Sequence, residues 1–132
     1  MPLNNCYPVA VVRRVLALQT LVARELPPRE AGVVTVGAFN AGTKHNIISD
    51  RAVLQVTVRN TNEETRKTLL DGIERIAVNM GRVAGLPEDK LPEVIYSEST
   101  PPTINSGDLA RRLRKVWQAK MGGGIMMDSD FV

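Results

Sequence analysis

Cysteine and histidine, which bind zinc in many proteins, are almost absent from this sequence. Its 132 residues include one cysteine, Cys6, and one histidine, His45. A single cysteine excludes both an internal disulfide and a zinc site built from several thiolates. It is typical of a reducing compartment, and we expect the protein to be cytoplasmic. A catalytic metal site needs several convergent ligands and no HExxH motif is present, so we predict no metal ligand in this chain.

Other features that identify common functions are also missing. No apolar run approaches the roughly 18–20 residues that cross a membrane, and residues 1–8 lack the pattern of a signal peptide. Two tyrosines, two phenylalanines and one tryptophan are too few for a platform that stacks single-stranded nucleic acid. There is no GxSxG elbow, and Gly122–Gly124 follow a predicted helix instead of opening one. We therefore predict no catalytic residue, and neither a membrane nor a nucleic acid as partner.

The overall composition is that of a small globular domain. Hydrophobic residues make up 43% and charged residues 23% of the chain, both near the average for globular proteins. The net charge of +3 is too small to indicate a nucleic-acid partner by itself. Part of the positive charge gathers in Arg111–Lys115. We interpret this segment as the solvated face of a helix, and the alternative is a surface for an anion or an acidic partner.

Apolar periodicity predicts a helix followed by two strands. Pro8 suits the first position of a helix, and Pro27-Pro28 ends it. Its apolar stripe consists of Val11, Val15, Leu18 and Val22, widened by Leu16 and Leu21. We predict strands at about 32–39 and at 52–59, which form an antiparallel hairpin. In the second strand the even-numbered residues from Ala52 to Val58 share one face, as expected when one face of a sheet is buried.

Two further helices and a short strand are predicted after the hairpin. A capping box from Thr61 to Glu64 opens the second helix, and Pro87 stops it. The apolar stripe of this helix is Leu69, Ile73, Ile76, Met80 and Val83. Residues 94–96 are predicted as a short strand, and Pro101-Pro102 as a linker. Ser106 is the expected N-cap of a last helix, whose apolar face is Leu109, Leu113, Val116 and Trp117.

This order predicts an α+β fold, an antiparallel sheet with helices packed on one face. A ferredoxin-like layer would begin with a strand before the first helix, and nothing before Pro8 can supply it. We therefore expect exposed apolar surface and self-association. An exposed part of the first helix, or an unpaired strand edge near Val33, is a candidate subunit interface.

The turn between the two strands is the candidate polar site. His45 and Asn46 lie within the sequence AGTKHNIISD, residues 41–50. Ordinary turn chemistry explains both residues, since asparagine hydrogen-bonds locally and tolerates a left-handed backbone. Contact with a ligand is the alternative.

The segment GAFNAGTKHNIISDRAVLQVTVRN resembles the strand–turn–strand segment of zinc-dependent aminoacylases, hippurate hydrolases and related amidohydrolases. Ser49 and Val56 depart from the usual proline and glycine of that pattern. Residues 101–105, PPTIN, resemble the family's return toward its catalytic domain. The matching positions are Gly42, Thr43, Asn46, Ile48, Asp50, Ala52, Leu54, Thr57, Val58 and Arg59.

The resemblance implies the lid and dimerisation domain of a two-domain amidohydrolase, incomplete at its N-terminus. Residues 1–100 would be this lid domain with its first strand missing, and residues 101–132 a segment returning to a catalytic domain. Asn46, Gly42 and Arg59 would lie on the substrate side, while His45 matches no functional position. The family's two zinc ions, or similar divalent ions, would be bound outside this chain. In the tail, Ser129 replaces an expected glutamate.

The resemblance therefore favours a fragment of a metal-dependent amidohydrolase that is inactive alone. Its parent enzyme would act on an N-acyl amino acid or a peptide-like substrate. The expected partner is a second copy of the chain or a full-length relative. The alternative is a non-enzymatic module for homo-association.

Overall fold

The computed structural model describes residues 7–122, and the side chains from residue 10 onward. Residues 1–6 and 123–132 lie outside this range, and with them Cys6 and the tail with Asp128, Ser129 and Asp130. The chain divides into two compact units, residues 1–100 and residues 101–132.

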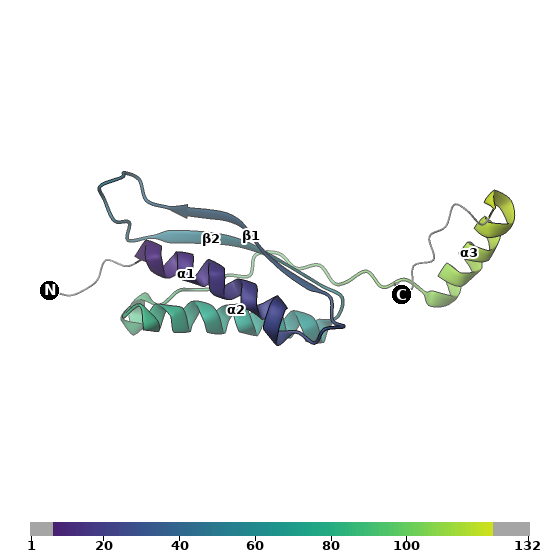
Figure 1. Ribbon diagram of the computed structural model, residues 1–132, viewed down its shortest axis with the longest axis horizontal. Coiled ribbons are helices and arrows are strands. Elements are labelled where there is room, and N and C mark those ends of the chain that lie inside the picture. Colours follow the sequence, from purple (N-terminus) through teal and green to yellow (C-terminus); the bar gives the residue numbers. More distant parts are fainter. Residues whose placement is uncertain (1–6, 123–132) are drawn as a thin grey trace. The chain divides into compact units, whose positions relative to one another are not determined.

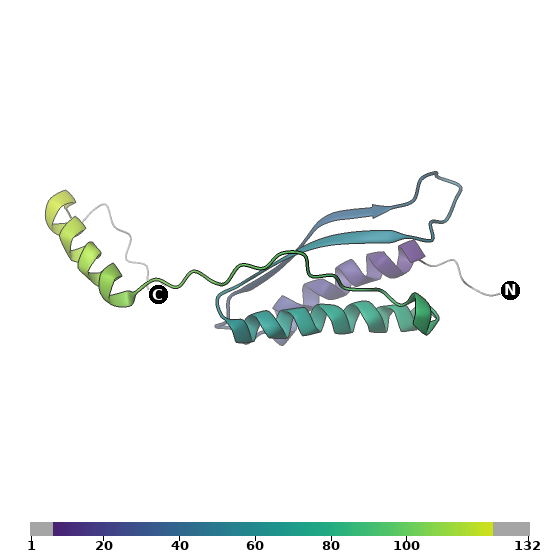
Figure 2. The same cartoon turned by 180° about the vertical axis from the view of Figure 1, so that it is seen from behind.

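The first unit consists of two helices and a β-hairpin. Helix α1 spans Tyr7–Thr20 and continues as a π-helical turn, Leu21–Glu25. Strand β1 spans Gly32–Ala41, strand β2 spans Ala52–Asn60, and helix α2 spans Glu63–Val83. Both helices pack on one face of the antiparallel hairpin (Figures 1 and 2). The predicted fold class, α+β with helices on one face of an antiparallel sheet, is confirmed.

A β-bulge at Gly37 sets the register of the hairpin. Val34 pairs with Val58 and Val36 with Val56, and beyond Gly37 the partner of Phe39 is Leu54. One extra residue in β1 thus changes which of its side chains face the helices, because side chains alternate along a strand. In β2 the exposure alternates from residue to residue throughout, as the sequence predicted.

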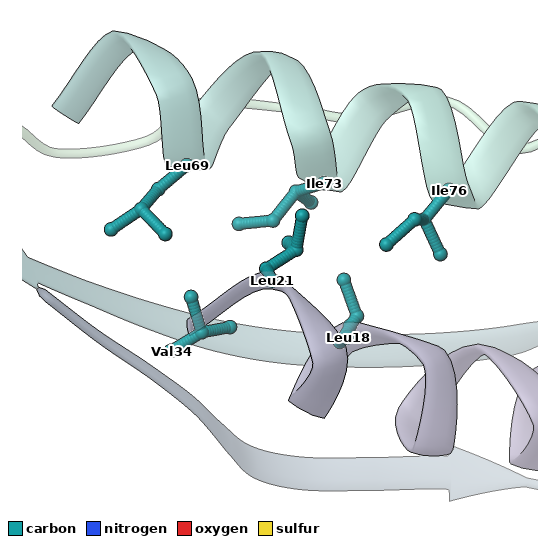
Figure 3. Packing of buried hydrophobic residues seen from close by; sticks show 6 residues of the cluster. All are labelled: Leu18, Leu21, Val34, Leu69, Ile73 and Ile76. Atoms are coloured by element: carbon teal, nitrogen blue, oxygen red, sulfur yellow. The ribbon is translucent and has the colours of Figure 1, made fainter. Parts of the chain in front are cut away.

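The core lies where the two helices meet the hairpin (Figure 3). Its fully buried residues are Leu21, which is 1% exposed, and Leu69, which is 0% exposed. The helices approach closely at this point because Gly72 has no side chain, and a Cβ there would clash with Leu21 Cδ2. The other members of the core are Leu18, Val34, Ile73 and Ile76. Burying a leucine or isoleucine contributes about 1.5–3 kcal/mol, so these residues dominate the stability of the unit.

The start of α2 differs from the predicted capping box. The N-cap is Asn62, not Thr61, since Asn62 Oδ1 accepts a hydrogen bond from the Thr65 backbone N–H at 2.8 Å. Asn62 Nδ2 and Thr65 Oγ1 both donate to Glu30 Oε2, each at 2.8 Å. These two hydrogen bonds, Thr65 first, hold the pKa of Glu30 below its ordinary value. Asn62 therefore caps the helix and also links α2 to the loop before β1 through Glu30.

Three other details of the prediction were wrong. Residues 94–96 are not a strand, because residues 92–100 make no backbone hydrogen bond to any described residue. Val83 is 72% exposed and is not part of the stripe of α2, which ends at that residue. Leu16 is 67% exposed and does not widen the buried face of α1.

The second unit contains helix α3, Gly107–Met121. Ser106 is its N-cap as predicted, with its Oγ accepting a hydrogen bond from the Leu109 N–H at 3.4 Å. Gly122, at φ +80°, ends the helix in a conformation that glycine adopts readily. The predicted apolar side chains of α3, Leu109, Leu113, Val116 and Trp117, are between 39% and 53% exposed.

The core predicts a large effect for one substitution and a small effect for another. Leu69→Ala should lower the free energy of unfolding by about 2–5 kcal/mol, since it removes a fully buried side chain. The control Val83→Ala changes an exposed residue of the same helix and should stay within about 0.5 kcal/mol. Urea denaturation followed by circular dichroism measures both. Equal midpoints for the two variants would contradict the placement of the core.

Candidate functional site

The loop between β1 and β2, residues 42–51, contains two of the three predicted site residues. It begins at Gly42, whose φ of +82° lies in the left-handed region. Ser49 closes its other end, because Ser49 Oγ accepts from the Arg51 N–H at 3.2 Å and donates to the Arg51 carbonyl at 2.7 Å. Within the loop, the Ile47 N–H donates to the Lys44 carbonyl at 3.3 Å. Local turn chemistry therefore determines the shape of the loop.

Asn46 and His45 lie at the exposed part of this loop. Neither side chain forms a hydrogen bond with another residue of the described range. The amide of Asn46 can therefore donate to or accept from a ligand without first breaking a bond within the chain. A Cβ at Gly42 would have no atom within 4 Å, so the backbone is also accessible there.

Arg59, the third predicted site residue, lies far from the loop. It pairs with Val33 near the end of β2, whereas the loop joins the start of β2 at Ala52. At about 3.3 Å per residue these two ends of β2 are roughly 23 Å apart. The structure thus brings Gly42 and Asn46 together and leaves Arg59 apart from them. Contact of these three residues with a substrate stays a prediction.

A second candidate site lies along the outer edge of β1. Among the described strands, β1 pairs only with β2, so its other edge presents unpaired backbone groups. Next to this edge Val12 and Leu16 of α1 are 48% and 67% exposed, and Val33 of β1 is 49% exposed. A shallow groove of about 290 Å³ runs between α1 and residues 32–34. We call the β1 edge with Val12, Leu16 and Val33 the β1–α1 surface.

Arg14 of α1 is a notable residue that the sequence prediction missed. Its Nε and Nη2 atoms are buried and have no hydrogen-bond partner in the described part of the chain. Burial lowers the pKa of this guanidinium below its ordinary value. The sequence pattern could have identified Arg14. It lies between Val11 and Leu18 on the buried side of the helix, where a charged residue is unusual.

Residues 7–122 provide no metal centre. No group of three or more His, Cys, Asp or Glu side chains able to hold a metal ion occurs in that range. In the same range, no helix has both the length and the apolarity that a membrane span requires.

The comparisons with known proteins agree with this architecture. Residues 17–83, more than half of the chain, match the family model of the peptidase dimerisation domain. Hippurate hydrolase of Campylobacter jejuni is 33% identical over 101 residues, which cover 76% of this chain and 26% of that protein. N-acetyldiaminopimelate deacetylase of Streptococcus sanguinis is 32% identical over 115 residues, which cover 86% of this chain and 29% of that protein.

One solved structure supports the same assignment. A protein of methicillin-resistant Staphylococcus aureus, assigned as an aminohydrolase, superposes with a TM-score of 0.74 at 28% identity. The match covers 88% of this chain and 30% of that one. The fold is therefore that of an α+β domain found within longer hydrolases, and this chain spans less than a third of their length. The chain belongs to the peptidase dimerisation domain family, which confirms the resemblance found in its sequence.

The left-handed backbone at Gly42 predicts that alanine lowers the stability of the protein more at Gly42 than at Gly37. Gly42→Ala should lower the free energy of unfolding by about 1–2 kcal/mol, because an L-residue is strained at a left-handed φ. Gly37→Ala is the control, since a Cβ there would make an ordinary contact at 3.8 Å with the Gln55 carbonyl. Thermal unfolding of both variants measures the difference. If Gly42→Ala is as stable as Gly37→Ala, the loop does not hold the described conformation.

Proposed function

We propose that this chain is the homodimerising lid domain of a metal-dependent amidohydrolase. In this proposal residues 1–100 form the lid, and residues 101–132 lead toward a catalytic domain. The relatives named above are a hydrolase and a deacetylase that act on N-acyl amino acids according to their names. We infer a substrate of the same kind, an N-acyl amino acid or a peptide-like amide, for the whole enzyme.

The observation that carries dimerisation is the β1–α1 surface. It combines a free strand edge with exposed apolar side chains on the adjacent helix. Two copies can pair their β1 edges antiparallel around a two-fold axis and bury Val12 and Leu16 against the partner helix. Such an arrangement satisfies the unpaired backbone groups of β1 and covers apolar surface in one step. A full-length relative with the same surface could replace the second copy.

The catalytic part of the proposal assigns supporting roles to this chain. Two zinc ions, held by another part of the enzyme, would activate the water that attacks the amide. From the lid, Asn46 would hydrogen-bond the substrate, and the accessible backbone at Gly42 would let the substrate approach. Arg59 would contact the substrate from the other end of β2, apart from Asn46 and Gly42. Without the zinc ligands, the chain should not hydrolyse an amide by itself.

Leu16→Glu tests the proposed dimer. The substitution places a charge at the centre of the β1–α1 surface and should weaken dimerisation about tenfold to a hundredfold, as expected for the loss of about 1.5–3 kcal/mol of apolar burial. Sedimentation equilibrium of the wild type and the variant measures the dissociation constant.

Val83→Glu is the matched control for this experiment. Val83 is 72% exposed, similar to Leu16, but it lies at the end of α2. This variant should dimerise like the wild type. A monomeric wild type, or equal weakening by both substitutions, would contradict the proposed interface.

A further inference from the structure

The open end of the hairpin, where β1 begins at Gly32 and β2 ends at Asn60, lies against the start of α2. A Cβ at Gly32 would lie 3.1 Å from Leu69 Cδ1 and 3.4 Å from Thr65 Cγ2, both in side chains of α2. Figure 2 shows the open end of the hairpin and the start of α2 at the same end of the unit. The first residue of β1 therefore packs directly on the first turns of α2.

One carboxylate connects the two elements at this point. Glu30 precedes β1 by two residues, and its Oε2 atom accepts hydrogen bonds from Asn62 Nδ2 and Thr65 Oγ1, each at 2.8 Å. Asn62 is also joined to the end of β2, because Asn60 Nδ2 donates to the Asn62 carbonyl at 2.9 Å. The hydrogen bonds thus connect the loop before β1, the first turn of α2 and the last residue of β2.

The donor and the acceptor at this point differ in their exposure to solvent. Thr65 is 3% exposed, whereas Glu30 is exposed. The Thr65 hydroxyl needs an acceptor, because a buried hydroxyl without a partner is costly. The carboxylate, in contrast, exchanges protons with solvent directly. A carboxylate accepts stronger hydrogen bonds than a neutral carboxyl group, so protonation of Glu30 weakens both of its hydrogen bonds at once.

No ion pair among the described residues includes Glu30. Arg66 of α2 pairs with Glu63 at 3.6 Å instead. The response of Glu30 to pH therefore depends on its two hydrogen bonds, Thr65 first, which hold its pKa below the ordinary value. The charged residues on the adjoining segments are Arg29 in the loop, Arg59 of β2, and Glu63, Glu64 and Arg66 of α2.

We propose that Glu30 is an acid-sensitive clamp, whose ionised carboxylate holds the open end of the hairpin on α2 and whose protonation releases that end. Because the pKa of Glu30 is lowered in the folded state, the clamp contributes fully above the ordinary pKa of glutamate. Its contribution is lost as the pH falls through the lowered pKa. The clamp does not depend on the function proposed above.

The release should be local. Leu21 contacts α2 at Gly72, about two helical turns beyond Thr65, and this part of the core is apolar. The released end includes Val33 and Arg59, which pair with each other next to the first residue of β1. Acid should therefore loosen the end of the hairpin that contains Arg59 while the helices stay packed on each other.

Hydrogen exchange of single amides, measured by NMR on the full chain, tests the clamp. The Thr65 and Arg66 N–H groups report on it, because they donate to Asn62 Oδ1 and to the Asn62 carbonyl. The Ile76 amide, in the middle of α2, reports on the core. Protection factors are compared from about pH 7 to about pH 2.5, where carboxylates titrate. Protection of Thr65 and Arg66 should fall about threefold to tenfold more than that of Ile76, as two charge-assisted hydrogen bonds become neutral.

Two glutamate variants identify the carboxylate. Glu30→Gln is neutral at every pH, so protection of Thr65 and Arg66 should already be low at neutral pH and should follow that of Ile76 on acidification. Glu64→Gln is the matched control, since it removes another exposed carboxylate from the first turn of α2. This control should keep the pH response of the wild type.

Two threonine variants test the buried donor. Thr65→Val removes the hydroxyl with little change in shape and should reduce the pH response, whereas Thr65→Ser retains the hydroxyl and should keep it. Circular dichroism shows whether each variant folds, and the comparison of amides within the wild type does not depend on the variants.

Three results would overturn the proposal. Equal loss of protection at Thr65, Arg66 and Ile76 in the wild type would show that acid unfolds the unit as a whole. A wild-type pH response in Glu30→Gln would assign the response to another group. Loss of the response in Glu64→Gln would assign it to Glu64.

Discussion

The packing of Leu21 against Leu69 and Gly72 is the contact on which the first unit depends. A two-stranded hairpin is at best marginally stable in water, so β1 and β2 require the helices that cover them. The helices in turn bury their apolar stripes against each other and the inner face of the hairpin. Leu21 lies in the π-helical turn at the end of α1, where it contacts α2 at the position that lacks a side chain.

Within residues 7–122 both edges of the two-stranded sheet are unpaired, and the two edges differ in their surroundings. Beside β1 lie exposed apolar side chains of α1, which favour a flat contact with an identical surface. Beside β2 lies a groove with an apolar floor. Residues 92–96 form its other wall, and the half-buried Arg14 lines it. A hairpin of two strands thus leaves apolar side chains of both described helices beside its edges.

Much of the fold could be predicted from local sequence patterns. The alternation in β2 and the spacing of Leu69, Ile73 and Ile76 each identify an element and its buried face, because periodicity follows directly from backbone geometry. The N-cap of α2 was misplaced by one residue, since Asn62 is selected by its contacts with Glu30, which is distant in the sequence. Residues 94–96 have strand propensity, but no strand within residues 7–122 pairs with them, and propensity alone does not form a ladder.

The sites were harder to predict than the fold. Gly42 and Asn46 lie in one loop because they are close in the sequence, whereas the position of Arg59 depends on the length and register of β2. The burial of Arg14 becomes apparent only when α1, α2 and residues 92–96 are assembled, since burial without a partner among the described residues is a property of the tertiary structure. Motif similarity identified the family and implied a missing first strand, but most of the matched positions lie in the hairpin and its loop.

By the function proposed above, this chain is an association domain that completes its surface with a second copy. The most direct test is equilibrium unfolding in urea at two protein concentrations that differ by a factor of about 100. A dimer that unfolds to monomers gains about 2.7 kcal/mol of apparent stability over that range by mass action, so the midpoint should rise with concentration. An unchanged midpoint would show a monomer that is stable by itself and would contradict the account.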